Sequence, residues 1–143
     1  MFSAYWRMPE KTKEEFTADG FFITGDVGRV DETGRLWLSG RAKDLIISGG
    51  YNVYPKEIEL VLDELPGVIE SAVIGAPHPD FGESVVAVIA GSGDEAATIK
   101  AAREKLAAFK APKRVFFVDD LPRNAMGKVQ KNLLREKYRG VFQ

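Results

Sequence analysis

The stretch DLIISGGYNVYPKEIELVLDEL, residues 44–65, joins a predicted β-hairpin directly to an amphipathic helix. Its segments LIIS and YNVY are short and rich in β-branched and aromatic residues, and Ser48-Gly49-Gly50 between them forms a turn that needs positive φ angles. Pro55 suits the first position of a helix. One apolar face then follows at helical spacing, made of Ile58, Val61, Leu62 and Leu65.

Downstream, three apolar segments predict strands and two amphipathic segments predict helices. The strands are VIESAVIGA (68–76), SVVAVIA (84–90) and VFFV (115–118), and the second is apolar enough to be central and covered on both faces. Residues 96–109 predict a helix whose inner face holds Ile99, the stem of Arg103, Leu106 and Phe109. Residues 131–138 predict a closing helix with Leu133, Leu134 and Tyr138 inward. The order predicts an α+β fold: a β-hairpin plus a three-stranded sheet packed with about three helices.

The first 42 residues have a different character. After a short helical segment near residues 11–18, FFITGDVGRV (21–30) and RLWLSG (35–40) predict two strands joined by the turn DETG (31–34). One hairpin with this much apolar surface cannot bury itself. We therefore expect residues 1–42 to be the last β segment of a larger, truncated domain, and residues 43–143 to be a second domain.

Composition narrows the possible classes of function. The chain has 143 residues, 45% of them hydrophobic, no cysteine and one histidine, His78. Disulfides, thiolate metal sites and multi-histidine metal sites are therefore excluded, and we expect no metal site. No apolar run approaches the roughly 20 residues that span a bilayer, and the N-terminus lacks the apolar core of a secretory signal, so we expect a cytoplasmic protein by default.

The net charge of −1 is the sum of an acidic N-terminal part and a basic C-terminal part. Residues 1–102 contain 9 lysines and arginines against 17 acidic residues, whereas residues 103–143 contain 11 against 4. A basic tail suits nucleic acid, a membrane or a phosphorylated ligand, but charge alone is more typical of a solvated helical surface. Because no aromatic residues are interleaved among these cations in a stacking pattern, we expect no nucleic-acid binding.

Three short motifs carry both a structural and a functional interpretation. Thr24-Gly25-Asp26 ends a predicted strand, where Asp26 is either a turn residue or a carboxylate that accepts hydrogen bonds from a ribose diol. Arg41 and Lys43 follow Gly40, so they are either exposed cations or a nucleotide contact and a hinge. Gly49-Gly50 forms either a tight hairpin or a point of close backbone approach to a ligand.

The segment LPRNAMGKVQK, residues 121–131, places Lys128 behind a glycine. It is not a phosphate-binding Walker loop, because Pro122 and Val129 stand where that pattern needs Gly and Ser or Thr. The glycine predicts a free backbone and a mobile lysine, which suits a site where negative charge develops. A basic surface residue is the alternative. His78, between two prolines in a predicted loop, is more typical of a structural residue than of a catalytic one.

Together these motifs, in this order and spacing, resemble the adenylate-forming superfamily, which includes acyl-CoA synthetases, luciferases and peptide-synthetase adenylation domains. The resemblance runs from about Tyr5 to Tyr138. It implies the small, mobile C-terminal domain of this superfamily, preceded by the last strands of the large N-terminal domain. The rest of that domain, with its phosphate loop and acyl pocket, is missing, so we expect the break at Lys43 and no catalysis by the fragment alone.

The resemblance also implies a reaction and roles for individual residues. The intact enzyme would activate a carboxylic acid with ATP and Mg²⁺ to an acyl-adenylate, then swing this domain and transfer the acyl group to coenzyme A. Asp26 would hold the ribose hydroxyls with help from Arg41, Lys43 would be the hinge, and Lys128 would bridge the carboxylate and the α-phosphate during adenylation only. The implied coenzyme A contacts are Gly49, Gly50, Lys110, Lys113 and Arg114.

Two finer predictions follow from the resemblance. YWRMPEKT, DGFFITGD, SGGYNVYPKEIE and LPRNAMGKVQK are most similar to malonyl- and methylmalonyl-CoA synthetases, and no carrier domain follows Gln143, which favours a free synthetase of the kind used in fatty acid metabolism. PRNAMGK also resembles the site at which protein acetyltransferases modify bacterial acyl-CoA synthetases. The alternative function is thus an acetyltransferase and deacetylase substrate, since acetylation of Lys128 would remove its charge.

Overall fold

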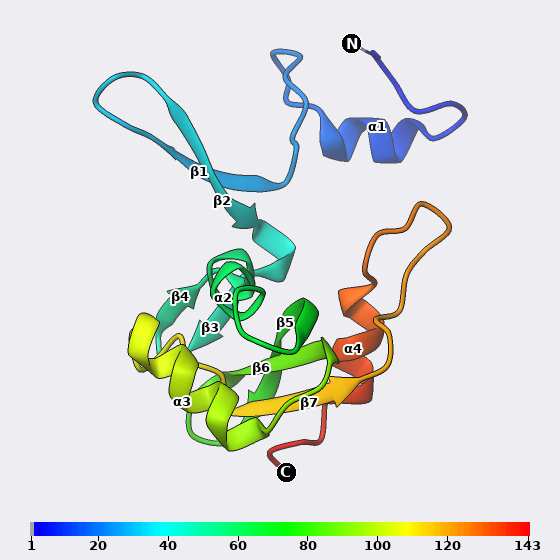
Figure 1. The fold of residues 1–143 in the computed structure, drawn as a ribbon. Coiled ribbons are helices and arrows are strands. Elements are labelled where there is room, and N and C mark those ends of the chain that lie inside the picture. The colour runs from blue at the N-terminus through cyan, green and yellow to red at the C-terminus, as the bar shows by residue number, and fades with distance from the viewer. Residues whose placement is uncertain (1) are drawn as a thin grey trace. The chain divides into compact units, whose positions relative to one another are not determined.

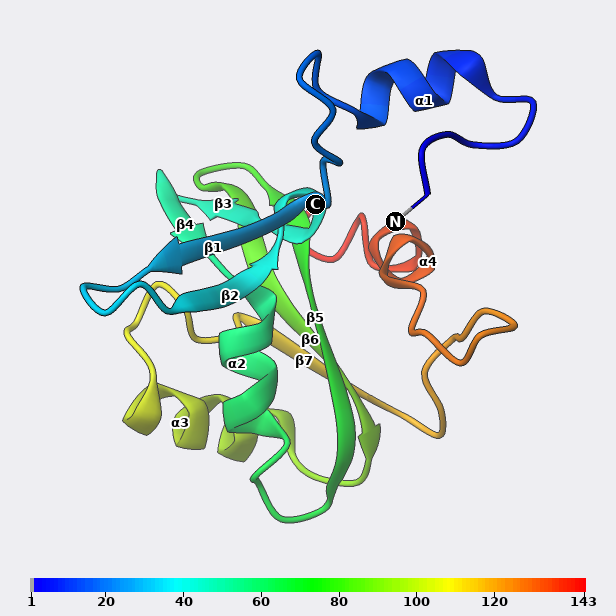
Figure 2. The ribbon, with the colours of Figure 1, turned by 90° about the horizontal axis from the view of Figure 1, so that it is seen from above.

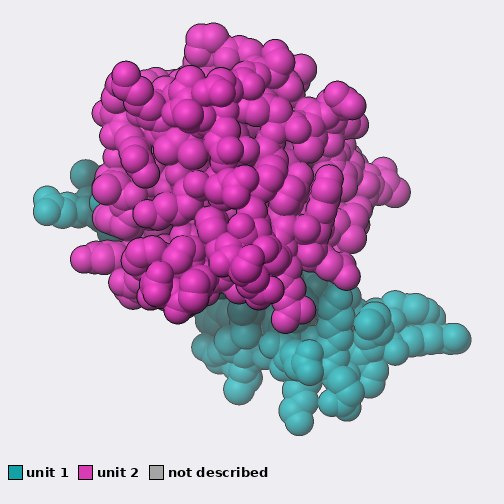
Figure 3. Space-filling model, turned by 90° about the horizontal axis from the view of Figure 1, so that it is seen from below, with its two compact units in different colours: residues 1–43 teal, residues 44–143 magenta. Residues whose placement is uncertain are grey.

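The computed structural model describes residues 2–143, which divide into two compact units, residues 2–43 and residues 44–143 (Figure 3). The division follows Lys43 directly, one residue later than the boundary drawn from the sequence.

The first unit holds one helix and one hairpin. Helix α1 spans Pro9–Glu15, with its proline in the first turn, and the antiparallel strands β1 and β2 span Asp26–Val30 and Leu36–Arg41. The first strand begins five residues later than predicted, because Gly25 has φ +71° and ends the extended run before Asp26. None of residues 2–43 is buried, so the hairpin leaves its apolar side chains exposed, as expected for a two-stranded ribbon.

Asp31 fixes the turn of this hairpin. Its Oδ1 accepts hydrogen bonds from the backbone N–H groups of Thr33 and Arg35 at 2.9 and 3.0 Å, and its Oδ2 accepts one from the Trp37 indole at 2.7 Å. Gly34 completes the turn at φ +80°. The predicted DETG turn is therefore confirmed, with the aspartate as its organising residue.

The second unit is a five-stranded sheet covered by helices on both faces (Figures 1 and 2). The strand order is β4-β3-β6-β5, and β7 lies beside β6 in parallel. The strands are β3 Ile46–Ser48, β4 Tyr51–Val53, β5 Val68–His78, β6 Gly82–Gly91 and β7 Arg114–Val118. The helices are the 3₁₀ turn η1 Ala42–Asp44 at the boundary, α2 Pro55–Leu62, α3 Glu95–Lys105 and α4 Lys131–Lys137.

The α+β class is confirmed, with the β-hairpin and the three further strands that the sequence predicts. Ser48 of β3 pairs with Gly82 of β6, so the hairpin and the other strands form one sheet. The central position of β6 is confirmed, since its alternate residues feed two cores. The core beneath α2 and α3 includes Ile58, Leu62, Val85, Ala87, Ile89 and Ala102, and the core beneath α4 includes Val86, Val88, Ala90, Leu121 and Leu134.

Two helices differ from their predicted patterns. Helix α3 ends at Lys105 rather than at residue 109, and Arg103 is exposed, whereas Ile99, Leu106 and Phe109 pack against the core as predicted. The fully buried residues of α3 are Thr98 and Ala102. The helix ends early because Leu106 is extended and a turn follows, which frees Phe109 to stack on Tyr51 at 4.6 Å. In α4, Leu134 is buried, but Leu133 is 43% exposed rather than inward, because one side of this short helix meets the sheet. His78 ends β5 instead of lying in a loop.

Strand β5 lies at an edge of the sheet. Side chains of α2 and of the residue that follows it accept hydrogen bonds from backbone N–H groups on the outer side of this strand. Asp63 accepts a hydrogen bond from the Ser71 N–H at 2.8 Å, and Glu59 accepts one from the Val73 N–H at 2.9 Å. Pro77, further along the same edge, has no N–H to satisfy. These contacts protect a long edge strand from pairing with another chain and fix α2 beside it.

Candidate catalytic loop and ligand contacts

Lys128 lies on a narrow loop between β7 and α4. The loop begins and ends with a bridge between Arg123 and Val129, and inside it the Asn124 N–H donates to the Lys128 carbonyl at 2.9 Å. The Asn124 Oδ1 accepts the N–H groups of Met126 and Lys128, each at 3.0 Å. Gly127 turns the chain at φ +76°, a conformation that few other residues adopt readily.

The loop backbone is thus held by its own hydrogen bonds, and the prediction of a free backbone was wrong. Asn124 does what the sequence pattern did not reveal: its side chain imitates a backbone turn and orients the amide of Lys128. The Lys128 side chain itself is exposed, and the loop extends away from the sheet (Figures 1 and 2). A fixed loop that carries an exposed ammonium can deliver a positive charge to a separate body.

Ion pairs anchor both ends of the loop. Arg123 donates to the Gly127 carbonyl at 2.8 Å and pairs with Glu70 of β5. Lys131, the first residue of α4, places its Nζ 2.6 Å from the Glu59 carboxylate. Further along α4, Arg135 lies 2.5 Å from Asp44, the residue that follows the predicted hinge.

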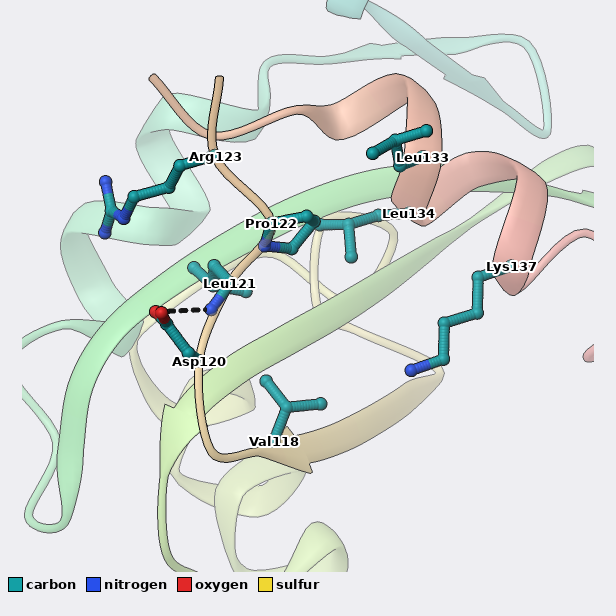
Figure 4. A pocket seen from close by; sticks show the side chains of 8 residues that line it. All are labelled: Val118, Asp120, Leu121, Pro122, Arg123, Leu133, Leu134 and Lys137. Atoms are coloured by element: carbon teal, nitrogen blue, oxygen red, sulfur yellow. Dashed lines mark hydrogen bonds between the residues drawn. The ribbon is translucent and has the colours of Figure 1, made fainter. Parts of the chain in front are cut away.

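A pocket of about 620 Å³ opens at the base of the loop (Figure 4). Val118 and Leu121 line it on one side and Leu133 and Leu134 of α4 on the other, while Lys137 reaches toward it from the end of α4. Its acidic residue, Asp120, accepts a hydrogen bond from the adjacent Leu121 N–H at 2.8 Å. None of the residues predicted to bind a ligand lines this pocket.

The predicted nucleotide residues, Asp26 and Arg41, come together in the first unit. They are paired across the β1–β2 ladder, with Arg41 Nε 2.9 Å from Asp26 Oδ1. Arg41 Nη1 also donates to the Thr24 carbonyl at 2.6 Å. Lys43, the predicted hinge, lies in η1 as the last residue of the first unit.

The residues predicted to contact coenzyme A divide into two groups. Gly49 and Lys113 line a pocket of about 240 Å³ together with Tyr51, Phe81 and Phe109. Gly49 and Gly50 form the β3–β4 turn at φ +57° and +83°, as predicted, and the Lys113 ammonium lies over the Phe81 ring. The aromatic walls were missed because Tyr51, Phe81 and Phe109 are far apart in sequence.

Lys110 and Arg114 are instead engaged in ion pairs. Lys110 contacts both carboxylate oxygens of Glu57, at 2.7 and 2.9 Å, and Arg114 lies 2.8 Å from Glu95. The backbone N–H of Val115 also donates to Glu95, and these contacts hold the pKa of the Glu95 carboxyl below its ordinary value. These ion pairs reduce the availability of the two cations for a phosphate.

The remaining predictions concern histidine, metals and membranes. The His78 ring lies against Phe81 and Phe142, with centroids 4.7 and 5.0 Å apart, a packing role rather than a catalytic geometry. Within residues 2–143, no group of three or more His, Asp or Glu side chains is arranged to hold a metal ion. Over the same residues, no helix is long and apolar enough to cross a bilayer.

Comparison with known proteins identifies the family to which this chain belongs. The family model described as the AMP-binding enzyme C-terminal domain matches residues 57–128, which include most of α2, strands β5, β6 and β7, and the loop up to Lys128. The chain belongs to this family. This C-terminal domain family is the one predicted from the ordered motifs, and its match confirms the resemblance to the adenylate-forming superfamily.

Curated relatives and solved structures agree with this assignment. The long-chain-fatty-acid–CoA ligase FadD13 of Mycobacterium tuberculosis is 44% identical over 94% of this chain and 27% of its own length. The malonate–CoA ligase of Arabidopsis thaliana is 42% identical over 95% of this chain and 25% of its own. The crystal structure of ATP-bound MatB from Rhodopseudomonas palustris is 59% identical, with a TM-score of 0.90 over 100% of this chain and 29% of that one. The chain therefore spans about a quarter of the length of these relatives.

Proposed function

We propose that this chain is the C-terminal part of an AMP-forming acid–CoA ligase and that Lys128 is its catalytic residue for adenylation. The observation that carries the proposal is the loop itself: Asn124 fixes its backbone while the ammonium of Lys128 stays exposed. The family match and the names of the relatives, which are CoA ligases, support the reaction class. Residues 1–43 would then belong to the larger N-terminal domain.

In the first half-reaction, a carboxylate oxygen attacks the α-phosphorus of MgATP. A C–O–P linkage forms, the bond to the bridging oxygen breaks, and pyrophosphate leaves with the electron pair. Negative charge is shared between the attacking carboxylate and the α-phosphate, and an ammonium placed against both stabilises this transition state. Lys128 would supply this charge, and the Asp26–Arg41 pair would hold the ribose.

In the second half-reaction, the coenzyme A thiol displaces AMP from the acyl-adenylate. We propose that the second unit turns about Lys43 between the two steps, so that Lys128 leaves and the β3–β4 turn takes its place. Gly49 and Gly50 present no side chain at that turn, and Lys113 lies beside it over Phe81. Of the predicted coenzyme A contacts, we retain these three ahead of Lys110 and Arg114.

A fusion protein tests the reaction class. In the Arabidopsis malonate–CoA ligase, the C-terminal part that this chain matches would be replaced by residues 1–143. We expect the fusion to form AMP and malonyl-CoA from ATP, malonate and coenzyme A, whereas the ligase truncated before this part should not. A folded fusion that forms no AMP, beside an active parent ligase, would contradict the proposal.

For the acyl substrate, we propose malonate or methylmalonate. The support is the similarity of this chain, along nearly its whole length, to the malonate–CoA ligase. The complete ligase that contains this chain should be assayed with malonate, methylmalonate and a long-chain fatty acid at equal concentrations. The proposal predicts the highest kcat/KM for one of the two dicarboxylates, and a preference for the fatty acid would contradict it.

A further inference from the structure

A buried ion pair lies at the root of the catalytic loop. Glu59 is only 7% exposed, and its carboxylate is 2.6 Å from the ammonium of Lys131. Lys131 begins α4, three residues after Lys128. The pair therefore joins the helix that follows the loop to helix α2, from a position more than 70 residues away in the sequence.

Stability alone is a poor explanation for such a pair. Removing two charges from water costs several kcal/mol per ion, by order of magnitude, and well-packed apolar replacements of buried ion pairs are often as stable or more so. An apolar contact between α2 and α4, however, would allow the helices to slide. A short charged contact fixes one atom of Lys131 against one atom of Glu59.

Glu59 is itself held in place by the sheet. The oxygen that meets Lys131 also accepts the Val73 N–H at 2.9 Å, so the carboxylate is anchored to the edge of β5. The opposite end of the loop is anchored to the same strand, through the pair between Arg123 and Glu70. Glu70 and Val73 lie three residues apart on β5. Both ends of the segment that carries Lys128 are thus anchored to one short stretch of β5.

We propose that Glu59 and Lys131 are positioning residues for Lys128, which set where its ammonium lies during adenylation. This inference rests on the proposed function of Lys128. Its physical basis is that electrostatic catalysis depends on donor position, and a displacement of about 1 Å can cost about 100-fold in rate. Neither residue touches the substrate; each acts through the loop that it fixes.

The test separates positioning from folding in the complete ligase that contains this chain. Lys131→Met and Lys131→Arg would be assayed for ATP–pyrophosphate exchange, and for thioester formation from preformed acyl-adenylate. We expect Lys131→Met to lower the exchange rate by about 10- to 100-fold, with thioester formation within about twofold of the parent. Lys131→Arg keeps the charge and should recover most of the exchange.

A matched control and an uncharged double variant complete the design. Lys105→Met breaks the exposed 2.8 Å pair between Lys105 and Glu64, a residue just after α2, and should change neither half-reaction. Glu59→Gln combined with Lys131→Met removes both charges but keeps the acceptor for the Val73 N–H, so it should be about as stable as the parent in thermal unfolding, yet still lose exchange. Full exchange in this stable double variant would overturn the inference.

Other outcomes are equally decisive. If Lys131→Met lowers both half-reactions equally, or neither, the positioning role is wrong. Lys128→Ala, measured in parallel, shows which proposal has failed. If exchange survives Lys128→Ala, the proposed function fails. If Lys128→Ala abolishes exchange and Lys131→Met leaves it intact, only the positioning inference fails.

Discussion

The Arg41 guanidinium and the Asp26 carboxylate face each other across the last register pair of the β1–β2 ladder, 2.9 Å apart. Arg41 is held in turn by the Thr24 carbonyl at 2.6 Å. This arrangement orients a carboxylate at a strand end, where it can accept hydrogen bonds from a vicinal diol. It is the local geometry that the proposed ribose contact requires.

Replacement of Asp26 should therefore weaken ATP binding in the complete ligase. A hydrogen bond to a charged group contributes about 1.5–3 kcal/mol, so Asp26→Asn should raise the KM for ATP by about 10- to 100-fold. The KM for coenzyme A should change little, because this contact does not involve the thiol substrate. Steady-state kinetics with each substrate varied in turn would measure this, and an equal increase in both KM values would argue against a ribose contact.

Asn124 should matter for adenylation although it carries no charge. Asn124→Ala removes the acceptor for the N–H groups of Met126 and Lys128, which at about 0.5–1.5 kcal/mol each should slow ATP–pyrophosphate exchange by roughly tenfold. Asn124→Asp keeps the Oδ1 acceptor and should retain most of the exchange. If Asp behaved like Ala at this position, the turn would not be what orients Lys128.

Lys113 and Lys110 should respond differently to the same substitution. Lys113 lines the small aromatic pocket beside Gly49, whereas the Lys110 ammonium already contacts both oxygens of Glu57. Lys113→Met should raise the KM for coenzyme A several-fold, and Lys110→Met should raise it less and instead lower the thermal stability. The reverse order of KM effects would move the phosphate contact to Lys110.

Asp31 should give the hairpin an acid-sensitive turn. Hydrogen bonds from the Thr33 side chain and the Trp37 indole lower the pKa of Asp31 from an ordinary value of 3.8 to about 2. Because the folded pKa is the lower one, the stabilisation is fully present above pH 3.8 and is lost as the pH falls through about 2. The Trp37 indole N–H resonance should titrate near pH 2, and this transition should vanish in Asp31→Asn. A midpoint near 3.8 would show that the turn does not hold the carboxylate.

Sequence patterns correctly predicted the elements that depend only on residues close together in the chain. The turn at Gly49-Gly50, the helix that begins at Pro55 and the central strand at 84–90 follow from φ preferences, proline geometry and continuous apolar sequence. The loop that carries Lys128 was also predicted from sequence, but the hydrogen bonds within it were not. They depend on the side chain of Asn124, which accepts the backbone N–H groups of Met126 and Lys128.

Long-range contacts could not be predicted from these patterns. Nothing near Lys131 indicates that its partner is Glu59, and nothing near Ser48 indicates that β3 joins β6 through Gly82. Helix α3 shows the same limit, because the stacking of Phe109 on Tyr51 lies outside the helix that apolar spacing had assigned to it. Acetylation of Lys128, whose side chain is exposed, stays a prediction that mass spectrometry can test.

In the proposed mechanism, Lys128 acts in adenylation and in no later step. The most direct measurement compares the two half-reactions of Lys128→Ala in the complete ligase that contains this chain. We predict that ATP–pyrophosphate exchange falls by about 100- to 1,000-fold, as when an oxyanion donor is lost, while thioester formation from preformed acyl-adenylate keeps its parental rate. An equal fall in both half-reactions, or unchanged exchange, would contradict it.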